Sequence, residues 1–309
     1  MAKKVIIDCD VGVDDALALI LAFHSPELEV LAVSGVNGNV PLEAVFENIQ
    51  KVLALIRPDH KPLIAKGADR PLKGRALYAH SVHGKTGLGE ATLDFKGDET
   101  WWSLFPGPAD ELFTRMARRH PREVTLIAIG PPTNLALAME KDPEGMKLLR
   151  EIVLMGGAVR TRGNVTPFAE FNIYSDPVAA QIVFESGIPT TLVPLDVTHQ
   201  VFLTPEAMEE RIRPIGTPFS QFLMEATGYD PKARRFRNRE RVFLHDPLAV
   251  GVVIDPGLAT KEKLRLCVQT EEGEGWGRIT EGRQGPELGV CLGVERERFL
   301  SLFISRLNP

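Results

Sequence analysis

The sequence predicts an α/β protein built on an open, mostly parallel central sheet with helices on both of its faces. Short apolar runs alternate with helical patterns along most of the chain, and several runs are apolar at nearly every position. Such runs are typical of parallel strands, which are buried on both sides. Strands that alternate with helices are joined by right-handed crossovers, which produce this open α/β arrangement.

The first part of the chain shows the alternation most clearly. Apolar, mostly β-branched runs predict strands at 5–7, 30–36 and 62–65. Between them, apolar residues at helical spacing predict helices over 16–23 and 42–56. The order strand, helix, strand is the repeating unit of a parallel sheet.

The same rhythm continues after residue 108. The predicted helices cover 109–119, 133–140, 177–185, 246–254 and 299–307. The predicted strands cover 124–129, 152–155 and 190–195, followed by alternating runs at 264–268 and 288–292. Between these last two runs, the segment 271–277 is typical of a hairpin tip.

Two segments interrupt the rhythm. Residues 66–108 are rich in Gly, Pro and His and predict a long functional loop region. Residues 228–241 hold six Lys/Arg and two acidic residues. This basic segment is either a solvated helix or loop face, as charge runs usually are, or a mobile flap over a site with Tyr229 and Phe236 as contacts.

Length and composition are those of an ordinary globular protein. The 309 residues contain no repeat or obvious linker, so we expect one domain over 1–309. The net charge of −5 argues against a nucleic-acid partner, and no run reaches the roughly 18 apolar residues of a membrane span. Residues 1–8 do not resemble a signal peptide, and three widely spaced cysteines give no disulfide framework or thiolate zinc site. We therefore expect a cytoplasmic protein without a membrane partner.

The strongest local signal is an acidic loop between the first predicted strand and the first predicted helix. Asp8, Asp10, Asp14 and Asp15 place four carboxylates within eight residues. Ligands of an open parallel sheet bind at the carboxyl ends of its strands, where this loop lies. Helix capping accounts for Asp14 and Asp15, but four close carboxylates repel one another unless a cation joins them or some stay protonated. The oxygen-rich set favours Ca²⁺ or Mg²⁺ over capping alone.

Two further segments place polar groups near predicted strand ends. Asn164, Glu170 and Asn172 offer amide and carboxylate groups suited to sugar hydroxyls, although their segment alone is more typical of an ordinary turn. The segment 129–134 follows a predicted strand, and its backbone carbonyls are possible metal ligands. On its own, it is more typical of a plain strand-to-helix turn.

A histidine and an aspartate precede the predicted helix over 246–254. Asp246 suits the N-cap of this helix, with Pro247 at its first helical position. His245 is a candidate proton donor, but a lone histidine is more often merely packed. The pair by itself therefore does not decide between structure and catalysis.

Taken together, these segments resemble the inosine–uridine nucleoside hydrolase family. The acidic loop matches the family's opening pattern DCDxGxDDA over 8–16. The other matches occur in family order at Gly38-Asn39-Val40, 82–89, Gly130-Pro131-Pro132-Thr133-Asn134, Met155-Gly156-Gly157, Ala169-Glu170-Phe171-Asn172 and His245-Asp246-Pro247. They run from residue 5 to about 255. The resemblance implies the Rossmann-like fold of this family, in agreement with the predicted sheet.

The resemblance also implies an activity and a set of site residues. Family members cleave the N-glycosidic bond of ribonucleosides to ribose and free base with one bound Ca²⁺ per subunit, and they are usually dimers or tetramers. The implied calcium ligands are Asp10, Asp15, Asp246 and the backbone carbonyl of Ile129. The implied substrate contacts are Asp14 and Asn172 for the 2′- and 3′-hydroxyls, Asn164 and Glu170 for the 5′-hydroxyl, Asn39 and Phe171 nearby, and His83 at the base.

The implied mechanism follows the usual needs of glycosidic cleavage. A metal-bound water attacks the sugar, Asp10 removes its proton, and His245 protonates the departing base. The acidic pocket stabilises an oxocarbenium-like transition state. The preference for purine or pyrimidine bases stays open, because residues 220–241 match the family least.

Two departures and two alternatives accompany this interpretation. Val11 replaces a proline and Pro132 replaces a leucine that are common in the family, and both changes are expected to alter loop stiffness only. A haloacid-dehalogenase-type phosphohydrolase also opens with Asp-x-Asp after its first strand, but it does not account for the segments at 170–172 and 245–246. A catalytically silent nucleoside- or calcium-binding module is the other alternative, and the presence of every implied ligand counts against it.

Overall fold

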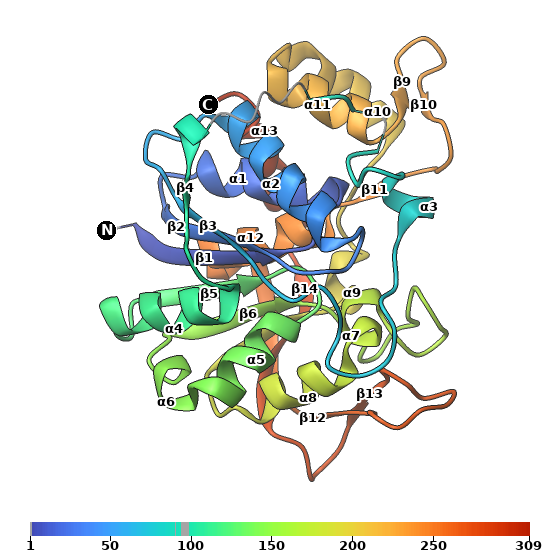
Figure 1. Cartoon of the computed structure of the whole chain (residues 1–309). Helices are drawn as coiled ribbons and strands as arrows, with labels where there is room; N and C mark the ends of the chain where they lie inside the picture. The colour runs from blue at the N-terminus through green and yellow to red at the C-terminus, as the bar shows by residue number, and fades with distance from the viewer. Residues whose placement is uncertain (1, 90, 94–98) are drawn as a thin grey trace.

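A computed structural model describes residues 2–89, 91–93 and 99–309, and a ten-stranded sheet forms its centre (Figure 1). The strand order is β13-β12-β14-β7-β6-β5-β1-β2-β3-β4. The strands are β1 (Lys3–Cys9), β2 (Leu28–Gly35), β3 (Leu63–Lys66), β4 (Ser103–Leu104), β5 (Val124–Ala128), β6 (Glu151–Met155), β7 (Thr190–Val193), β12 (Ala259–Val268), β13 (Ile279–Glu281) and β14 (Glu287–Val294). Only the pairings of β12 with β13 and β14 are antiparallel within this sheet as described, which confirms the mostly parallel sheet.

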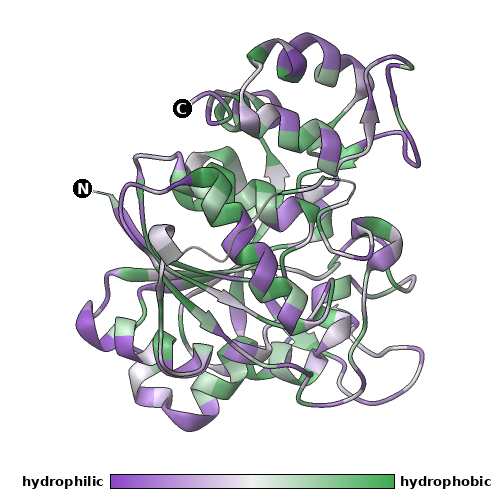
Figure 2. Cartoon of the chain, turned by 45° about the horizontal axis from the view of Figure 1, so that its top comes forward, coloured by the Kyte–Doolittle hydropathy of each residue, from purple (hydrophilic) through white to green (hydrophobic). Residues whose placement is uncertain are grey.

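Helices cover both faces of the sheet, as predicted (Figure 1). One face carries α1 (Val13–Phe23), α2 (Leu42–Ile56), α12 (His245–Ile254) and α13 (Arg296–Ser305), and the other carries α4 (Ala109–Arg119), α5 (Thr133–Lys141), α6 (Pro143–Met146) and α8 (Pro177–Glu185). Val5 and Ile7 of β1 pack into the first layer, whereas Ile6 packs into the second. In Figure 2, much of the ribbon of the central strands and of the helices packed on them has the green of hydrophobic residues. No helix among the described residues has the length and apolarity needed to cross a membrane.

The chain forms further, mostly short, elements. They are α3 (His80–His83), α7 (Phe171–Ser175), α9 (Leu195–Thr198), α10 (Pro205–Ala207), α11 (Pro218–Ala226), the π-helix Met208–Ile212, and the 3₁₀ turns Glu99–Trp101, Arg213–Ile215 and Pro256–Leu258. Two short antiparallel pairs, β9 (Tyr229–Asp230) with β10 (Arg235–Phe236) and β8 (Phe202–Leu203) with β11 (Val242–Phe243), complete the fold.

Several predicted boundaries need correction. The predicted strand at 190–195 ends at Val193, because Leu195 donates its N–H to the carbonyl of Gly157 at 2.8 Å and begins α9. The loop region 66–108 includes α3 and the edge strand β4, while residues 90 and 94–98 lie outside the described residues. The tip at 271–277 connects β12 to the unpredicted β13.

Both interpretations of the basic segment are partly wrong. Its first half is the β9–β10 hairpin, and Tyr229 and Phe236 pack against each other with ring centroids 5.4 Å apart. Both rings are buried in the core and do not line the pocket described below. Residues 232–235 are exposed, as a solvated face requires, but the segment's last residues return to the pocket.

Asn134 ties three segments together at the end of the sheet. Its amide nitrogen donates to Asp8 Oδ1 at 2.9 Å and to the carbonyl of Gly35 at 3.1 Å, and its Oδ1 accepts from the N–H of Ala68 at 2.7 Å. Asn134→Ala removes all three hydrogen bonds, although Asp8 Oδ1 still accepts from the Ser34 hydroxyl, so we expect the free energy of unfolding to fall by about 1–3 kcal/mol. Urea unfolding measures this loss, with the exposed Asn308→Ala as control. Equal midpoints for the two variants would contradict the prediction.

Candidate active site

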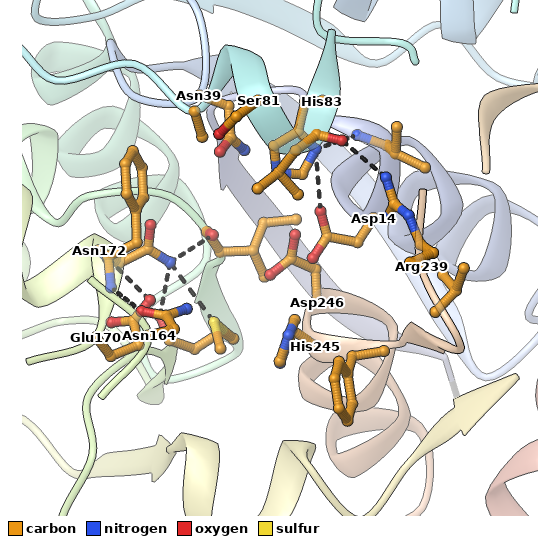
Figure 3. Close-up of a pocket in the computed structure, with 18 of the residues that line it drawn as sticks. Asp14, Asn39, Ser81, His83, Asn164, Glu170, Asn172, Arg239, His245 and Asp246 are labelled. Carbon is orange, nitrogen blue, oxygen red and sulfur yellow. Dashed lines mark hydrogen bonds and ion pairs between the residues drawn. The ribbon is translucent and has the colours of Figure 1, made fainter. Parts of the chain in front are cut away.

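A pocket of about 380 Å³ opens at the carboxyl ends of β1, β5 and β6 (Figure 3). This is the position at which an open parallel sheet binds its ligands. Every residue that the sequence predicts for the site lines this pocket except Asp10 and Asp15. The predicted lining residues are Asp14, Asn39, His83, Ile129, Asn164, Glu170, Phe171, Asn172, His245 and Asp246.

Asp15 shapes the loop that joins β1 to α1. Its carboxylate accepts from the backbone N–H of Gly12 at 2.8 Å and of Asp10 at 3.1 Å. Gly12 is the N-cap of α1, so Asp15 satisfies an N–H group that the helix leaves unpaired. The predicted capping role therefore holds for Asp15.

Asp10 lies below the pocket surface and is only 1% exposed. Its Oδ2 accepts from the N–H of Asn39 at 2.6 Å, while its Oδ1 is buried without a hydrogen-bond partner among the described residues. A Cβ at Gly38 would lie 2.0 Å from Asp10 Oδ2, so a glycine is needed for this approach. Burial, followed by the charge of Asp15, raises the pKa of Asp10 well above its ordinary value.

The acidic residues converge although they are far apart in the sequence. One carboxylate oxygen from each of Asp14, Asp15 and Asp246 lies within 4.8 Å of the others. Burial and then the charge of Asp14 raise the pKa of Asp15 to about 7, and the same two causes raise the pKa of Asp246. Like charges held together away from water are costly unless protons or a cation neutralise them.

Asp246 reaches this cluster from the first turn of α12. The helix begins at His245 with Leu244 at its N-cap, so the prediction of Asp246 as N-cap is wrong. Its carboxylate is 3% exposed and faces the other acidic groups. The orphaned Asp10 Oδ1 and this cluster fit a hard cation, because both offer buried carboxylate oxygens and no described Cys or His belongs to the cluster.

A network of amide and carboxylate groups forms the opposite wall of the pocket (Figure 3). Glu170 is the N-cap of α7, and its carboxylate accepts from the N–H groups of Gly157 at 2.7 Å and Asn172 at 2.8 Å. Asn172 donates from its amide to the carbonyls of Ile129 at 2.9 Å and Met155 at 3.1 Å. These bonds fix both side chains at the ends of β5 and β6, so the wall is formed before a ligand binds.

Asn164 extends the same wall from the preceding loop. Its Oδ1 accepts from the N–H of Phe171 at 2.9 Å, which anchors the loop to the start of α7. The carbonyl of Ile129, a predicted metal ligand, accepts from Asn172, but a carbonyl oxygen has a second lone pair. The structure thus brings the predicted sugar-binding residues together on one side of the acidic cluster.

Two histidines flank the cluster, with His83 above and His245 below Asp14 and Asp246 in the view of Figure 3. His83 Nδ1 accepts from the N–H of Val13 at 3.0 Å, so a neutral His83 carries its ring proton on Nε2. His245 Nδ1 lies 2.7 Å from Thr198 Oγ1. Burial lowers the pKa of His245 to about 4 and also lowers the pKa of His83, so both imidazoles are neutral near pH 7.

The pocket also contains residues to which the sequence analysis assigns no role in the site. Ser81 and Val82 come from α3, while Asn238, Arg239 and Arg241 come from the end of the basic segment. The proximity of that segment to His245 in the sequence is the signal that points to them. Because His245 lines the pocket, the residues directly before it in the sequence must also run close to the pocket.

The family model for inosine-uridine preferring nucleoside hydrolases matches residues 5–301. The chain is similar to the pyrimidine-specific ribonucleoside hydrolase RihA of Salmonella enteritidis PT4, with 37% identity over all of this chain and 99% of that protein. Among solved structures, the plant nucleoside hydrolase PpNRh1 is similar with a TM-score of 0.89 and 33% identity, over 100% of this chain and 99% of that one.

A second solved structure is also similar to this chain. The purine-preferring ribonucleoside hydrolase from Gardnerella vaginalis has a TM-score of 0.88 and 31% identity, and the match covers 99% of this chain and 98% of that one. The relatives of this chain thus differ in base preference. With its fold and nearly its whole length matched, the chain belongs to the inosine-uridine preferring nucleoside hydrolase family and is a hydrolase of nucleoside N-glycosidic bonds.

Proposed function

We propose that this enzyme converts ribonucleosides and water to ribose and free base in a calcium-dependent reaction. One observation carries the proposal: a carboxylate cluster lies beside a polar wall suited to a sugar, and two histidines flank the cluster. A nucleoside fits this arrangement, since the polar wall can bind the hydroxyls of its ribose and a histidine can donate to the base that departs. We further propose, from the family resemblance, that the chain forms a homodimer or homotetramer.

Asp10, Asp15, Asp246 and the carbonyl of Ile129 are the proposed calcium ligands. The orphaned Oδ1 of Asp10 and the burial of all three carboxylates support this set. When bound, Ca²⁺ would neutralise the carboxylates and make a neighbouring water more acidic. Asp14 belongs to the tightest cluster as well, and its position at the pocket surface suits contact with a sugar hydroxyl beside the ion.

The polar wall would orient the ribose. We assign Asn172 with Asp14 to the 2′- and 3′-hydroxyls, and Asn164 with Glu170 to the 5′-hydroxyl, with Asn39 and Phe171 alongside (Figure 3). Their hydrogen bonds to backbone groups already fix several of these side chains. A preformed wall reduces the entropy that is lost when C1′ is held for attack.

Asp10 is the proposed general base. Its Oδ2 is engaged by Asn39, whereas its Oδ1 has no protein donor and is therefore free to accept a proton from water. The buried negative charges around it would stabilise the oxocarbenium-like sugar as the bond to the base breaks.

His245 is the proposed donor to the departing base, and His83 helps to shape the base pocket. We assign the Thr198 hydroxyl, 2.7 Å away, as the donor to Nδ1 of His245, which places the ring proton of the neutral imidazole on Nε2. An Nε2–H group in the pocket donates to the base as negative charge accumulates on it.

A panel of substrates tests the proposed function. Inosine, adenosine, guanosine, uridine and cytidine are each assayed for released ribose and base, and a phosphomonoester is assayed for released phosphate. We expect ribose release from at least one nucleoside and no phosphate release. Calorimetric nucleoside binding without any ribose release would instead identify a silent binding module, and phosphate release would identify a phosphohydrolase.

Replacement of His245 is expected to have an effect that depends on the leaving group. For His245→Ala we expect kcat/KM for natural nucleosides to fall by about 10²-fold, because the base loses its hydrogen-bond donor. The loss should be much smaller for 4-nitrophenyl riboside, whose leaving group is stable as an anion. Thr198→Val, which removes the partner of Nδ1, should show a weaker form of the same pattern. Equal losses on both substrate types would contradict the assigned role.

A further inference from the structure

Asn48 joins two segments of the site that are far apart in the sequence. It lies on α2 and is 2% exposed. Its amide nitrogen donates to the backbone carbonyls of Val11 at 3.2 Å and Thr86 at 2.7 Å. Val11 directly follows Asp10 in the acidic loop, whereas Thr86 comes three residues after His83, the last residue of α3. One buried side chain thus connects the loop of the carboxylates to the segment that follows a histidine of the pocket.

This bridge requires the NH₂ group of an amide. Both partners of Asn48 are carbonyl oxygens, which can only accept, so one nitrogen has to offer a hydrogen to each of them. A serine has one hydrogen to donate, and an ionised aspartate or a leucine of similar size has none. The residue type at this position therefore follows from its two partners.

Two glycines allow the two segments to approach each other this closely. A Cβ at Gly87 would lie 2.7 Å from Asn48 Nδ2 and 2.8 Å from the carbonyl oxygen of Val11. A Cβ at Gly12 of the acidic loop would lie 2.5 Å from His83 Nδ1. Gly87 also has a φ of +91°, a conformation that other residues adopt only with strain. The junction around Asn48 is therefore built from the backbones of both segments.

The acidic loop has other supports, whereas the segment 84–89 has few. Asp15 and Asn39 hold the acidic loop through the hydrogen bonds described above. In the segment, the N–H of Gly89 donates to the carbonyl of His83 at 2.8 Å, which closes the segment on α3. Among the described residues, the bond from Asn48 is the one hydrogen bond that joins 84–89 to a helix or strand other than α3. Loss of Asn48 should therefore loosen this segment more than the acidic loop.

We propose that Asn48 is a positioning residue that keeps α3, and with it His83, in the arrangement that receives a nucleoside. The inference rests on the proposed function, in which His83 helps to shape the base pocket. The bond from Asn48 to Thr86 restrains the chain just after α3, as the bond from the N–H of Ala79 to the carbonyl of Asn39 at 2.9 Å restrains it just before. Without the restraint after α3, substrate binding has to order the helix. The apparent affinity for a nucleoside then falls in proportion to the fraction of molecules in which α3 is already ordered.

Asn48→Leu removes both donors and nearly keeps the size of the side chain. We expect KM for the best nucleoside to rise about tenfold while kcat stays within about threefold of wild type, because bound substrate still orders α3. The rise is limited because Val13 and Arg239 keep their hydrogen bonds to α3. A mere loss of folded protein would instead lower kcat and leave KM unchanged. Gln50→Leu, which removes a partly exposed amide from the same helix, is the matched control and should match wild type.

Hydrogen exchange tests the positioning without any substrate. In Asn48→Leu, the backbone amides of residues 79–89 should exchange faster than in wild type, whereas those of β1 and α1 should exchange at the wild-type rate. Gly87→Ala disturbs the same junction without a change in α2, so it should show the same faster exchange and the same rise in KM. This second variant decides the matter if Asn48→Leu does not fold.

A double substitution shows whether Asn48 acts through His83. In a His83→Ala background, Asn48→Leu should change KM by less than about threefold, because the side chain that it positions is already absent. An equal rise in KM in both backgrounds would overturn the proposal. Unchanged KM and exchange in the single variant would overturn it too, as would exchange that is equally faster in β1 and α1. If the wild-type enzyme hydrolyses no nucleoside, the proposed function itself fails, and the exchange rates still show whether Asn48 restrains α3.

Discussion

Asp10→Asn is expected to abolish detectable ribose release while the protein remains folded. The asparagine has nearly the same shape, and its amide oxygen can keep the 2.6 Å hydrogen bond from the N–H of Asn39. The amide nitrogen then replaces the orphaned Oδ1, so the only oxygen free to take a proton is lost. General-base catalysis typically contributes about 10²–10⁴-fold, and loss of a proposed calcium ligand adds to this effect.

Stability distinguishes this chemical effect from unfolding. The substitution removes one buried charge from a cluster of like charges, so the metal-free variant should unfold at the same or a higher temperature than metal-free wild type. Steady-state kinetics with the best nucleoside and thermal unfolding are measured on the same preparation. Asp59→Asn, the same change at an exposed position, is the control and should match wild type in both measurements. Turnover by Asp10→Asn within tenfold of wild type would rule out Asp10 as the base.

Much of the fold could be predicted because its core elements have strong local patterns. The bounds of α2, α4 and α8 agree with the predicted ranges, since each helix has clear apolar spacing and a proline or polar residue at its ends. The strands β4 and β13 escaped prediction because they have only two and three residues at the edges of the sheet. So few residues cannot show a period, and their pairing depends on tertiary contacts.

The site was predictable to the extent that its residues follow strand ends or occur in motifs. Asn164, Glu170 and Asn172 meet the acidic loop because they follow β6, two strands away from β1 in the sheet. The sequence does not determine how side chains within the loop point. In the structure, Asp14 joins Asp15 and Asp246 in one carboxylate cluster, which the motif alone did not indicate.

Arg239 illustrates what a sequence pattern cannot provide. In the sequence, the six basic residues of this short segment form a single charge run, and no pattern distinguishes one of them from the others. The β9–β10 hairpin turns most of them toward solvent, and the chain then returns to the pocket, where α3 supplies the carbonyl of Val82. The contact joins residues that are 157 positions apart, so only the tertiary structure distinguishes Arg239 from Arg235.

Removal of divalent cations is expected to eliminate ribose release, and Ca²⁺ is expected to restore it. Without a cation, burial and the repulsion of neighbouring carboxylates raise the pKa values of Asp10, Asp15 and Asp246. A cation neutralises this charge, so Ca²⁺ should also raise the unfolding temperature of the chelator-treated protein. Binding that occurs only in the folded state adds about 2.7 kcal/mol of stability at a ligand concentration 100 times Kd.

The thermal shift makes this test independent of turnover. Asp246→Asn removes one proposed ligand from α12 and should weaken Ca²⁺ binding in calorimetry while the metal-free protein stays folded, because a buried charge of the cluster is lost. The exposed Asp59→Asn should bind Ca²⁺ as wild type does. Full activity after removal of all divalent cations would exclude the calcium-dependent reaction. A Ca²⁺-induced stabilisation that Asp246→Asn leaves unchanged would place the ion elsewhere in the protein, because a ligand of the ion cannot be removed without a loss of affinity.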